Sequence, residues 1–405
     1  MSQPICERSL NGFSFSWPDM PVQVSLTRIK ESSRGTIGEI CCQVLAKTGK
    51  MTTLTHQSIN LLTSRSRLSK DLLTRYPDAP WDSILEQICV MALRELRKGA
   101  PIEFLEPGAV SPVAWFALNP LIYEHNSAVL YGPGDSMKSL IALYCGLLMA
   151  SGVSGANLMA APSRRRVLFL DWEMSVEDLR GRVRLLRAGD PRLDGTVDYR
   201  RCAYPLADEA AEMKKVIADG GYDMLILDSL AMAAGGGELE KAESAIRFNA
   251  ALRGLDCTSL VIGHTSKPND EQKERTIYGS VFFHNLCRVS WEVRREGQTV
   301  GLFQRKNNLG PKHDPLGFQI DIHAEACHIS VSDMSDEPTL TKSLPWPARI
   351  QMELQNGKAM TCQDLSVAMD ADEAIVRTTL SRMEKAGRVG KLSVKVGSEF
   401  AWQSL

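Results

Sequence analysis

Two hydrophobic patterns follow each other in the first quarter of the chain. From Gly12 to about Ala46 apolar and polar residues alternate, as in FSFSW and VQVSLTRIK, and this period of two predicts short β-strands. Apolar residues then recur at helical spacing near Ser58 to Arg75 and again, after the turn PDAPW, through DSILEQICVMALRELRKG. We therefore expect a small N-terminal α+β domain over residues 1–110. It carries no catalytic constellation, and we interpret it as a scaffold or partner-docking domain.

The pattern changes from about Pro112 to Ser332, where strands alternate with helices. Four apolar runs are typical of strands buried on both faces: SAVLYG, RRVLFLDWE, YDMLILDS and SLVIGHTS. We expect three later segments to extend the sheet as antiparallel or edge strands: VSWEV, TVGLFQRK and GFQIDI. The order predicts an α/β core with a mostly parallel sheet over residues 111–332.

A third pattern occupies the end of the sequence. The polar stretch DMSDEPTLTKS predicts a linker at residues 333–344. Residues 345–405 then show three helical segments, PARIQMELQNGK, TCQDLSVAMD and DEAIVRTTLSRMEKAG, followed by the hairpin GRVGKLSVKVGSEFAW. Three helices and a two-stranded wing predict a C-terminal winged helix.

Composition narrows the class of protein. A length of 405 residues favours two or three domains, and a formal net charge of −1 means that any contact with nucleic acid depends on local basic patches. The ten cysteines show no C-x-x-C spacing, which disfavours a zinc module or a disulfide framework and favours a reducing, cytoplasmic environment. The longest apolar run, Leu140 to Ala150, is too short to span a bilayer, so no membrane role is predicted.

The segment YGPGDSMKSL has the outline of a phosphate-binding P-loop, G-x-x-x-x-G-K-[ST]. It follows the apolar strand SAVLY and leads into a helix, so backbone N–H groups and the helix N-terminus would face the phosphates of ATP. The predicted nucleotide-binding residues are Gly132, Pro133, Gly134, Asp135, Ser136, Met137, Lys138 and Ser139.

Individual residues of this loop have separate expected roles. Gly132 and Gly134 supply backbone freedom, Lys138 can reach the β- and γ-phosphates, and Ser139 can bind Mg²⁺. Met137 stands where the signature has its second glycine. Because it lies close to the helix start, we expect a right-handed backbone there, which would make a side chain sterically possible.

Polar side chains also end the later strands. In LILDS, Asp228 ends an apolar strand and can orient Mg²⁺ through its water shell, as a Walker B carboxylate. In FLDWE, Glu173 lies just past the end of another strand, where a carboxylate beside the γ-phosphate can deprotonate the attacking water. His264, at the end of SLVIGH, is a candidate sensor of the γ-phosphate, although a lone histidine is more often structural.

The order GPGDSMKS, FLDWEM, LILDSL, VIGHTSK and QRKNNLGP resembles that of the RecA/DnaB-type ATPases. The resemblance is closest to the RepA-like hexameric helicases of plasmids and phages, also called the AAA_25 group, and it covers about residues 112 to 325. It implies a RecA-like fold, a homo-oligomer in the form of a hexamer, and catalytic roles for Glu173 and His264. A basic residue of the KNNLGP element would complete the site of a neighbouring subunit, and either Arg305 or Lys306 is the candidate.

The resemblance also implies that the loops after the third and fourth strands face a central pore and bind single-stranded DNA. The second of these loops offers Lys267, Lys273 and Arg275. The alternative is an ordinary solvated loop, because three nearby acids nearly cancel these charges.

The predicted winged helix carries a basic stripe of its own, which favours a contact with duplex DNA. Arg377, Arg382 and Lys391 are its candidate DNA contacts, with a protein-docking role as the alternative.

Together these features predict a Mg²⁺-dependent ATPase acting on DNA, in the form of a RepA-like replicative helicase or translocase of a mobile element. One alternative is a RecA-like recombination mediator or helicase loader. The other is a DNA-binding regulator that uses ATP only as an assembly switch.

Overall fold

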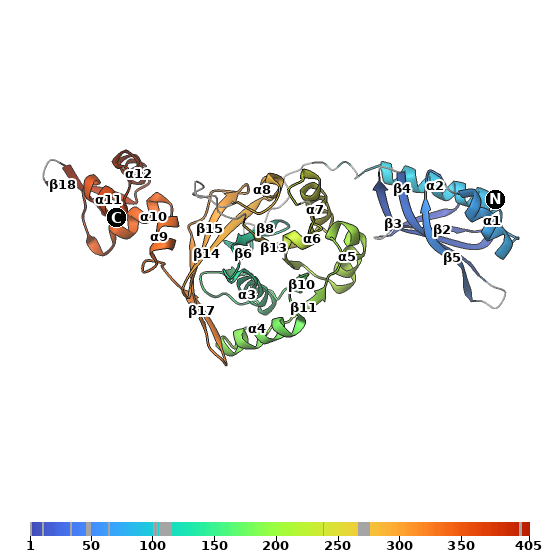
Figure 1. The fold of residues 1–405 in the computed structure, drawn as a ribbon, viewed down its shortest axis with the longest axis horizontal. Coiled ribbons are helices and arrows are strands. Elements are labelled where there is room, and N and C mark those ends of the chain that lie inside the picture. The colour runs from blue at the N-terminus through green and yellow to red at the C-terminus, as the bar shows by residue number, and fades with distance from the viewer. Residues whose placement is uncertain are drawn as a thin grey trace. The chain divides into compact units, whose positions relative to one another are not determined.

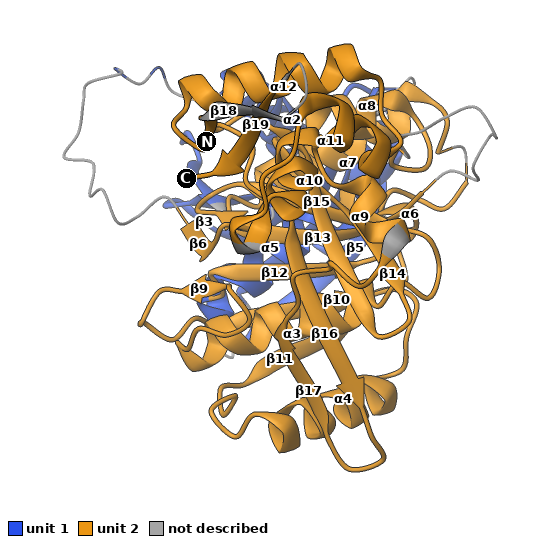
Figure 2. Ribbon diagram, turned by 90° about the vertical axis from the view of Figure 1, so that its left-hand side faces the viewer, with its two compact units in different colours: residues 1–111, 208–221 blue, residues 112–207, 222–405 orange. Residues whose placement is uncertain are grey.

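The computed structural model describes residues 2–9, 12–32, 35–45, 50–63, 65–99, 102, 104, 116–237, 239–265, 276–396 and 399–405. The chain forms two compact units (Figure 2). The first contains residues 1–111 and 208–221, and the second contains residues 112–207 and 222–405.

The N-terminal residues form an antiparallel sheet in sequence order, followed by two helices (Figure 1). The strands are β1 (Ile5–Ser9), β2 (Gly12–Trp17), β3 (Met20–Ser32), β4 (Gly35–Leu45) and β5 (Met51–Asn60), and the helices are α1 (Arg65–Arg75) and α2 (Trp81–Arg97). The alternation in FSFSW buries its aromatic side chains in one core with the apolar face of α2. The predicted helix near Ser58 begins too early, because residues up to Asn60 pair with β4 instead.

The second unit is built on a nine-stranded sheet with the order β11-β10-β12-β13-β8-β14-β15-β16-β17. Its strands are β8 (Ser127–Gly132), β10 (Val167–Asp171), β11 (Val197–Arg201), β12 (Met224–Asp228), β13 (Thr258–His264), β14 (Val289–Glu296), β15 (Thr299–Asn307), β16 (Leu316–Ile322) and β17 (Cys327–Val331). The first six in spatial order run parallel, and the last three are antiparallel. The predicted α/β core with a mostly parallel sheet is confirmed. The segment VSWEV differs from expectation, because β14 pairs parallel to β8.

Helices follow the strands of this sheet. They are α3 (Lys138–Ser151), α4 (Val176–Gly189), α6 (Leu230–Ala233), α7 (Ala242–Gly254) and α8 (Val281–Leu286). Helix α5 (Leu206–Gly220) follows β11 in the chain, but most of its residues belong to the first unit. A small additional sheet contains β6 (Phe116–Asn119), β7 (Ile122–Tyr123) and β9 (Met159–Ala160). Helix α3 is almost wholly buried against the central sheet. Among the described helices, none is both long and apolar enough to cross a membrane.

Strand order decides which side chains meet at the carboxyl edge of the parallel strands. Strand β13 lies between β12 and β8, so His264 is in register with Gly132. On the other side of β12, Asp228 is in register with Asp171 of β10. Because the carboxyl ends of parallel strands form one edge, this edge collects the P-loop and the polar residues that end three further strands.

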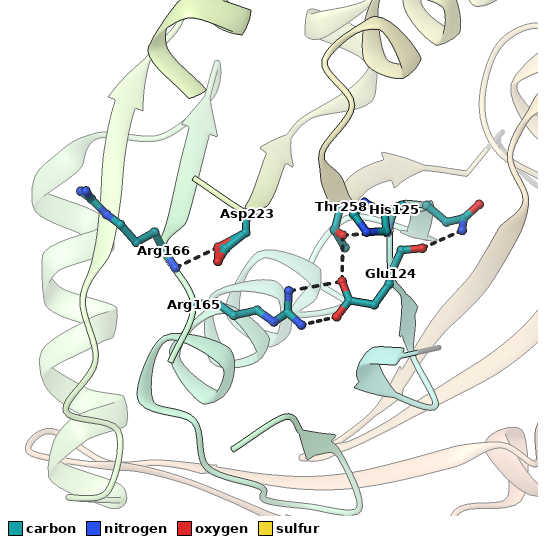
Figure 3. A network of polar contacts seen from close by, with 7 residues as sticks. Glu124, His125, Arg165, Arg166, Asp223 and Thr258 are labelled. Carbon is teal, nitrogen blue, oxygen red and sulfur yellow. Dashed lines mark hydrogen bonds and ion pairs between the residues drawn. The ribbon is translucent and has the colours of Figure 1, made fainter. Parts of the chain in front are cut away.

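The amino ends of the same strands carry a different set of polar contacts (Figure 3). Arg165 donates two hydrogen bonds to the carboxylate of Glu124, and the hydroxyl of Thr258 donates to the same carboxylate at 3.4 Å. Asp223 accepts a hydrogen bond from the backbone N–H of Arg166 at 3.2 Å. These contacts tie together the segments that enter β8, β10, β12 and β13.

The C-terminal segment of this unit begins with a short helix, and three further helices and a hairpin then surround a small core of their own. Its elements are α9 (Pro338–Ser343), α10 (Trp346–Glu353), the 3₁₀ turn η1 (Gln355–Gly357), α11 (Cys362–Met369), α12 (Glu373–Lys385), β18 (Val389–Val396) and β19 (Glu399–Ser404). The stretch predicted as a linker contains α9. Leu340 of this helix packs with Phe303 of β15, and Glu296 of β14 accepts a hydrogen bond from the Thr339 N–H at 2.9 Å.

Candidate nucleotide-binding site

The P-loop connects β8 to α3, and its two glycines differ in the space that their surroundings leave for a side chain. A Cβ atom at Gly132 would lie 2.5 Å from the Val293 carbonyl of β14, so only glycine fits. At Gly134 a Cβ would meet nothing within 4 Å, so the protein itself leaves this position open.

Met137 contradicts our expectation of a right-handed backbone. Its φ of 62° and ψ of 19° are left-handed, the conformation that favours the usual glycine. A left-handed residue other than glycine costs roughly 1–2 kcal/mol. The Met137 side chain packs against the core of the unit, and this contact offsets part of that cost.

Lys138 is buried at the base of the loop. Its Nζ donates hydrogen bonds to the Pro133 carbonyl at 2.6 Å and to the Ser136 hydroxyl at 3.2 Å. Burial lowers the pKa of Lys138, and the nearby carboxylates of Asp228 and Glu173 act in the opposite direction. A phosphate group is the ligand that would best compensate a buried ammonium held in this way.

Asp228 ends β12 with its side chain almost completely buried. Its Oδ2 atom has no hydrogen-bond partner within the described residues, and burial raises the pKa of this carboxyl to about 6. A hydrogen bond with the Ser139 hydroxyl lowers the pKa of Asp228, so this hydroxyl lies beside the Asp228 carboxylate. An unpartnered carboxylate oxygen beside a hydroxyl fits Mg²⁺, which prefers oxygen ligands.

Glu173 lies just past β10 and faces the same region. The Ser229 hydroxyl donates a hydrogen bond to its Oε1, and His264 Nε2 lies 3.7 Å from that oxygen. His264 is the main influence that lowers the pKa of Glu173, with a smaller contribution from Ser229, while burial opposes both. Glu173 is therefore ionised at neutral pH and can accept a proton from a bound water.

These residues surround one cavity of about 460 Å³. Its lining includes the loop from Gly134 to Leu140 together with Glu173, Asp228 and His264. It also includes two arginines that our sequence reasoning missed, Arg182 of α4 and Arg295 of β14. Arg295 donates a hydrogen bond to the Asp135 carbonyl of the P-loop at 3.0 Å. Only the pairing of β14 with β8 brings Arg295 to this loop, so its position in the sequence gave no signal.

The predicted trans-acting pair is not part of this cavity lining. Arg305 donates a hydrogen bond to the buried carboxylate of Glu292 at 2.7 Å, and Arg294 donates to the other oxygen of that carboxylate. Lys306 donates to the carbonyls of His284 and Asn285 at the end of α8. Both cations thus have partners in their own chain, and a role at a neighbouring subunit stays a prediction.

The predicted DNA-binding residues divide into two groups. Lys267, Lys273 and Arg275 lie outside the described residues. In the C-terminal segment Arg377 and Arg382 lie on the exposed face of α12, and Arg377 pairs with Glu373 one turn earlier. Lys391 is exposed on β18 with its ammonium 4.8 Å from the centre of the Trp402 ring.

Comparison with known proteins agrees with this geometry. Residues 96–270 match the family model of AAA_25, described as an AAA domain. The chain thus contains a P-loop NTPase domain of the AAA_25 type, a class that implies ATP and Mg²⁺ binding. A search among curated proteins gives no match.

One solved structure with a similar segment is the KaiC-like protein PH0186 from the hyperthermophilic archaeon Pyrococcus horikoshii OT3. The alignment covers 53% of this chain and 96% of that chain, at 13% identity and a TM-score of 0.37. A similarity this low supports no inference about fold or function.

Proposed function

We propose that this protein is a Mg²⁺-dependent ATPase that acts on DNA, as a RepA-like replicative helicase or translocase of a mobile element. One observation carries the ATPase part of the proposal. The unpartnered oxygen of Asp228 lies in the cavity that also holds the Lys138 ammonium and the Glu173 carboxylate. A cation site, a phosphate site and a base therefore converge within a single space.

The chemistry follows from these residues. The P-loop and Lys138 would bind the phosphates, and Ser139 and Asp228 would hold Mg²⁺, which would supply positive charge to neutralise the β- and γ-phosphates. Glu173 orients the attacking water and takes its proton, while the Ser229 hydroxyl fixes the carboxylate. His264 lies beside both Glu173 and Gly132, where it can respond to the loss of the γ-phosphate.

The DNA part of the proposal depends on the C-terminal helices and hairpin, which we interpret as a winged helix. Arg382 and Lys391 are exposed there and would contact duplex DNA, while Lys267, Lys273 and Arg275 would contact single-stranded DNA in a hexameric ring. ATP hydrolysis between subunits would then move the pore loops along the strand.

ATP turnover measured with and without single-stranded DNA tests this proposal. We expect DNA to stimulate turnover, and the stimulation to weaken steeply with salt because phosphate contacts release counterions. Glu173→Gln should bind ATP as the parent does and lower turnover by about 10²-fold or more, because it keeps the phosphate site and removes the base. An unaltered rate in Glu173→Gln would move the base to another residue.

A second candidate function is a DNA-binding regulator in which ATP is only an assembly switch. It is favoured by the contacts of Arg305 and Lys306, because cations held in their own chain are not free to complete a neighbouring site. Mixing the double variant Arg305→Ala, Lys306→Ala with Glu173→Gln separates the two functions. Recovery of ATP turnover in mixed oligomers supports a nucleotide site shared between two subunits. Absence of ATP turnover in the parent protein supports the regulator in which ATP is only an assembly switch.

The same parent protein can distinguish a helicase from a recombination mediator or helicase loader. A helicase should displace the labelled strand of a forked DNA in the presence of ATP. A mediator or loader should hydrolyse ATP on DNA without displacement.

A further inference from the structure

Asp171 ends strand β10 two residues before Glu173, and it is completely buried, with 0% of its surface exposed. Its Oδ1 accepts hydrogen bonds from the backbone N–H groups of Glu173 and Met174, both at 3.0 Å. Its Oδ2 accepts a hydrogen bond from the Tyr199 hydroxyl at 3.1 Å. Both oxygens are thus engaged, and Asp171 does not line the nucleotide cavity. It is poorly placed to act as a base itself.

The backbone around Asp171 is anchored to the neighbouring strands as well. The Trp172 N–H donates to the Asp228 carbonyl of β12 at 2.8 Å, and the Cys202 N–H donates to the Asp171 carbonyl at 2.8 Å. The turn that follows β10 is therefore fixed on both sides. Within it, and among the described residues, the N–H of Glu173 donates its hydrogen bond to the Asp171 carboxylate.

The placement of this N–H matters because it sets the direction in which the Glu173 side chain leaves the backbone. The Glu173 carboxylate has to lie between Ser229, His264 and the P-loop cavity at the same time. A displacement of about 1 Å in a reacting group can lower a rate by roughly 10²-fold. Hydrogen bonds to a charged acceptor are shorter and stronger than those to a neutral one, which suits a carboxylate to this task.

We propose that Asp171 is a positioning residue for ATP hydrolysis: its buried carboxylate holds the Glu173 backbone so that the Glu173 carboxylate meets the attacking water. This inference rests on the proposed ATPase function. Asp171 should therefore affect the rate of ATP hydrolysis and not nucleotide binding, because the P-loop and the Mg²⁺ ligands lie on other strands.

The test compares kcat for ATP with the affinity for Mg²⁺·ATPγS in full-length variants. Asp171→Ala should lower kcat by about 10- to 100-fold and change nucleotide affinity by less than about twofold. Asp171→Asn should stay within about threefold of the parent kcat, because its Oδ1 still accepts both N–H groups and its Nδ2 can donate to Tyr199. Asp223→Ala is the matched control, since Asp223 also accepts a backbone N–H but at the opposite edge of the sheet. Its kcat should equal that of the parent.

Several outcomes would overturn this inference. The first is an Asp171→Ala protein with the kcat of the parent. The second is an Asp171→Asn protein with a kcat as low as that of Asp171→Ala. The third is an Asp171→Ala protein that loses nucleotide affinity together with kcat. If Asp171→Ala does not fold, Asp171→Cys replaces it with the same expectation, because sulfur suits a buried site but is a weak acceptor. A parent without ATP turnover would instead remove the proposed function together with this inference, so the two failures are distinguishable.

Discussion

Two carboxylates at opposite edges of the central sheet, Glu124 and Asp228, differ in their hydrogen-bond partners. At the amino edge both oxygens of Glu124 accept hydrogen bonds, from Arg165 and Thr258. At the carboxyl edge the Oδ2 of Asp228 has no partner among the described residues, although only 2% of Asp228 is exposed. The first arrangement stabilises the fold, and the second leaves an oxygen available to a ligand.

Left-handed residues other than glycine occur at both edges. Asp135 and Met137 in the P-loop have φ values of 58° and 62°, and His125 and Asp256, which precede β8 and β13, have φ values of 54° and 51°. Backbone strain therefore does not separate the two edges, and the difference lies in the partners of the carboxylates. The comparison of Glu124 with Asp228 suggests that changes at the amino edge affect stability alone, while changes at the carboxyl edge affect chemistry.

The largest effect is expected from Lys138→Ala, which removes the point charge closest to the β- and γ-phosphates. Nucleotide binding and turnover should be abolished while the fold remains, as measured by isothermal titration calorimetry and circular dichroism. Lys385→Ala on α12 is the control and should bind nucleotide as the parent does. Normal turnover in Lys138→Ala would mean that the loop is not a P-loop in function.

At the opposite edge, Glu124→Gln should lower the free energy of unfolding by about 3 kcal/mol, because it leaves the largely buried Arg165 without its charged partner. Nucleotide affinity and kcat should not change. Arg164→Gln is the neighbouring control. Its pair with Asp194 is mostly exposed, with 60% and 56% of the side chains accessible, so its loss should leave the free energy of unfolding unchanged within the error of the measurement. A loss of kcat in folded Glu124→Gln would contradict the division between the edges.

Asp228→Asn should stabilise the nucleotide-free protein while it removes Mg²⁺-dependent turnover. The pKa of Asp228 is raised to about 6 from an ordinary value of 3.8, so the folded protein binds the proton more tightly than the unfolded chain does. The parent therefore loses stability as pH rises from about 4 to about 6, and the neutral amide avoids this loss. We expect a gain of about 3 kcal/mol at pH 8 that shrinks towards pH 4, measured by urea unfolding. Equal stability of the two proteins at pH 8 would contradict the idea that the buried, ionised Asp228 carboxylate destabilises the parent.

The smallest effect is expected from Met137→Gly. Glycine relieves the strain of the left-handed backbone, but it removes the packing of the Met137 side chain. Glycine also has more conformational freedom in the unfolded chain, which lowers the free energy of unfolding by about 0.4–1 kcal/mol. These contributions offset each other, so the free energy of unfolding should change by less than about 1 kcal/mol. Thermal unfolding and kcat measure this directly. A large gain in kcat would show that Met137 restrains the site.

The local pattern of the sequence was enough to predict the strands of the core and several of the residues that end them. Apolar runs in β8, β10, β12 and β13 are long enough to mark buried strands, and the last three of these strands end in a polar residue. The helix expected near Ser58 was wrong because pairing with β4 decides the state of that segment. Local spacing does not contain that information.

What the sequence by itself determined is the chemistry at the ends of these strands: a lysine and a serine after β8, a glutamate after β10, an aspartate at the end of β12. The tertiary structure alone decided which groups share a space. It placed Arg295 on the P-loop, engaged Arg305 with Glu292, and gave Met137 its left-handed backbone. The physical reason is that hydrogen bonds between strands and the packing around a loop connect residues far apart in the chain, whereas sequence patterns record only the preferences of neighbours.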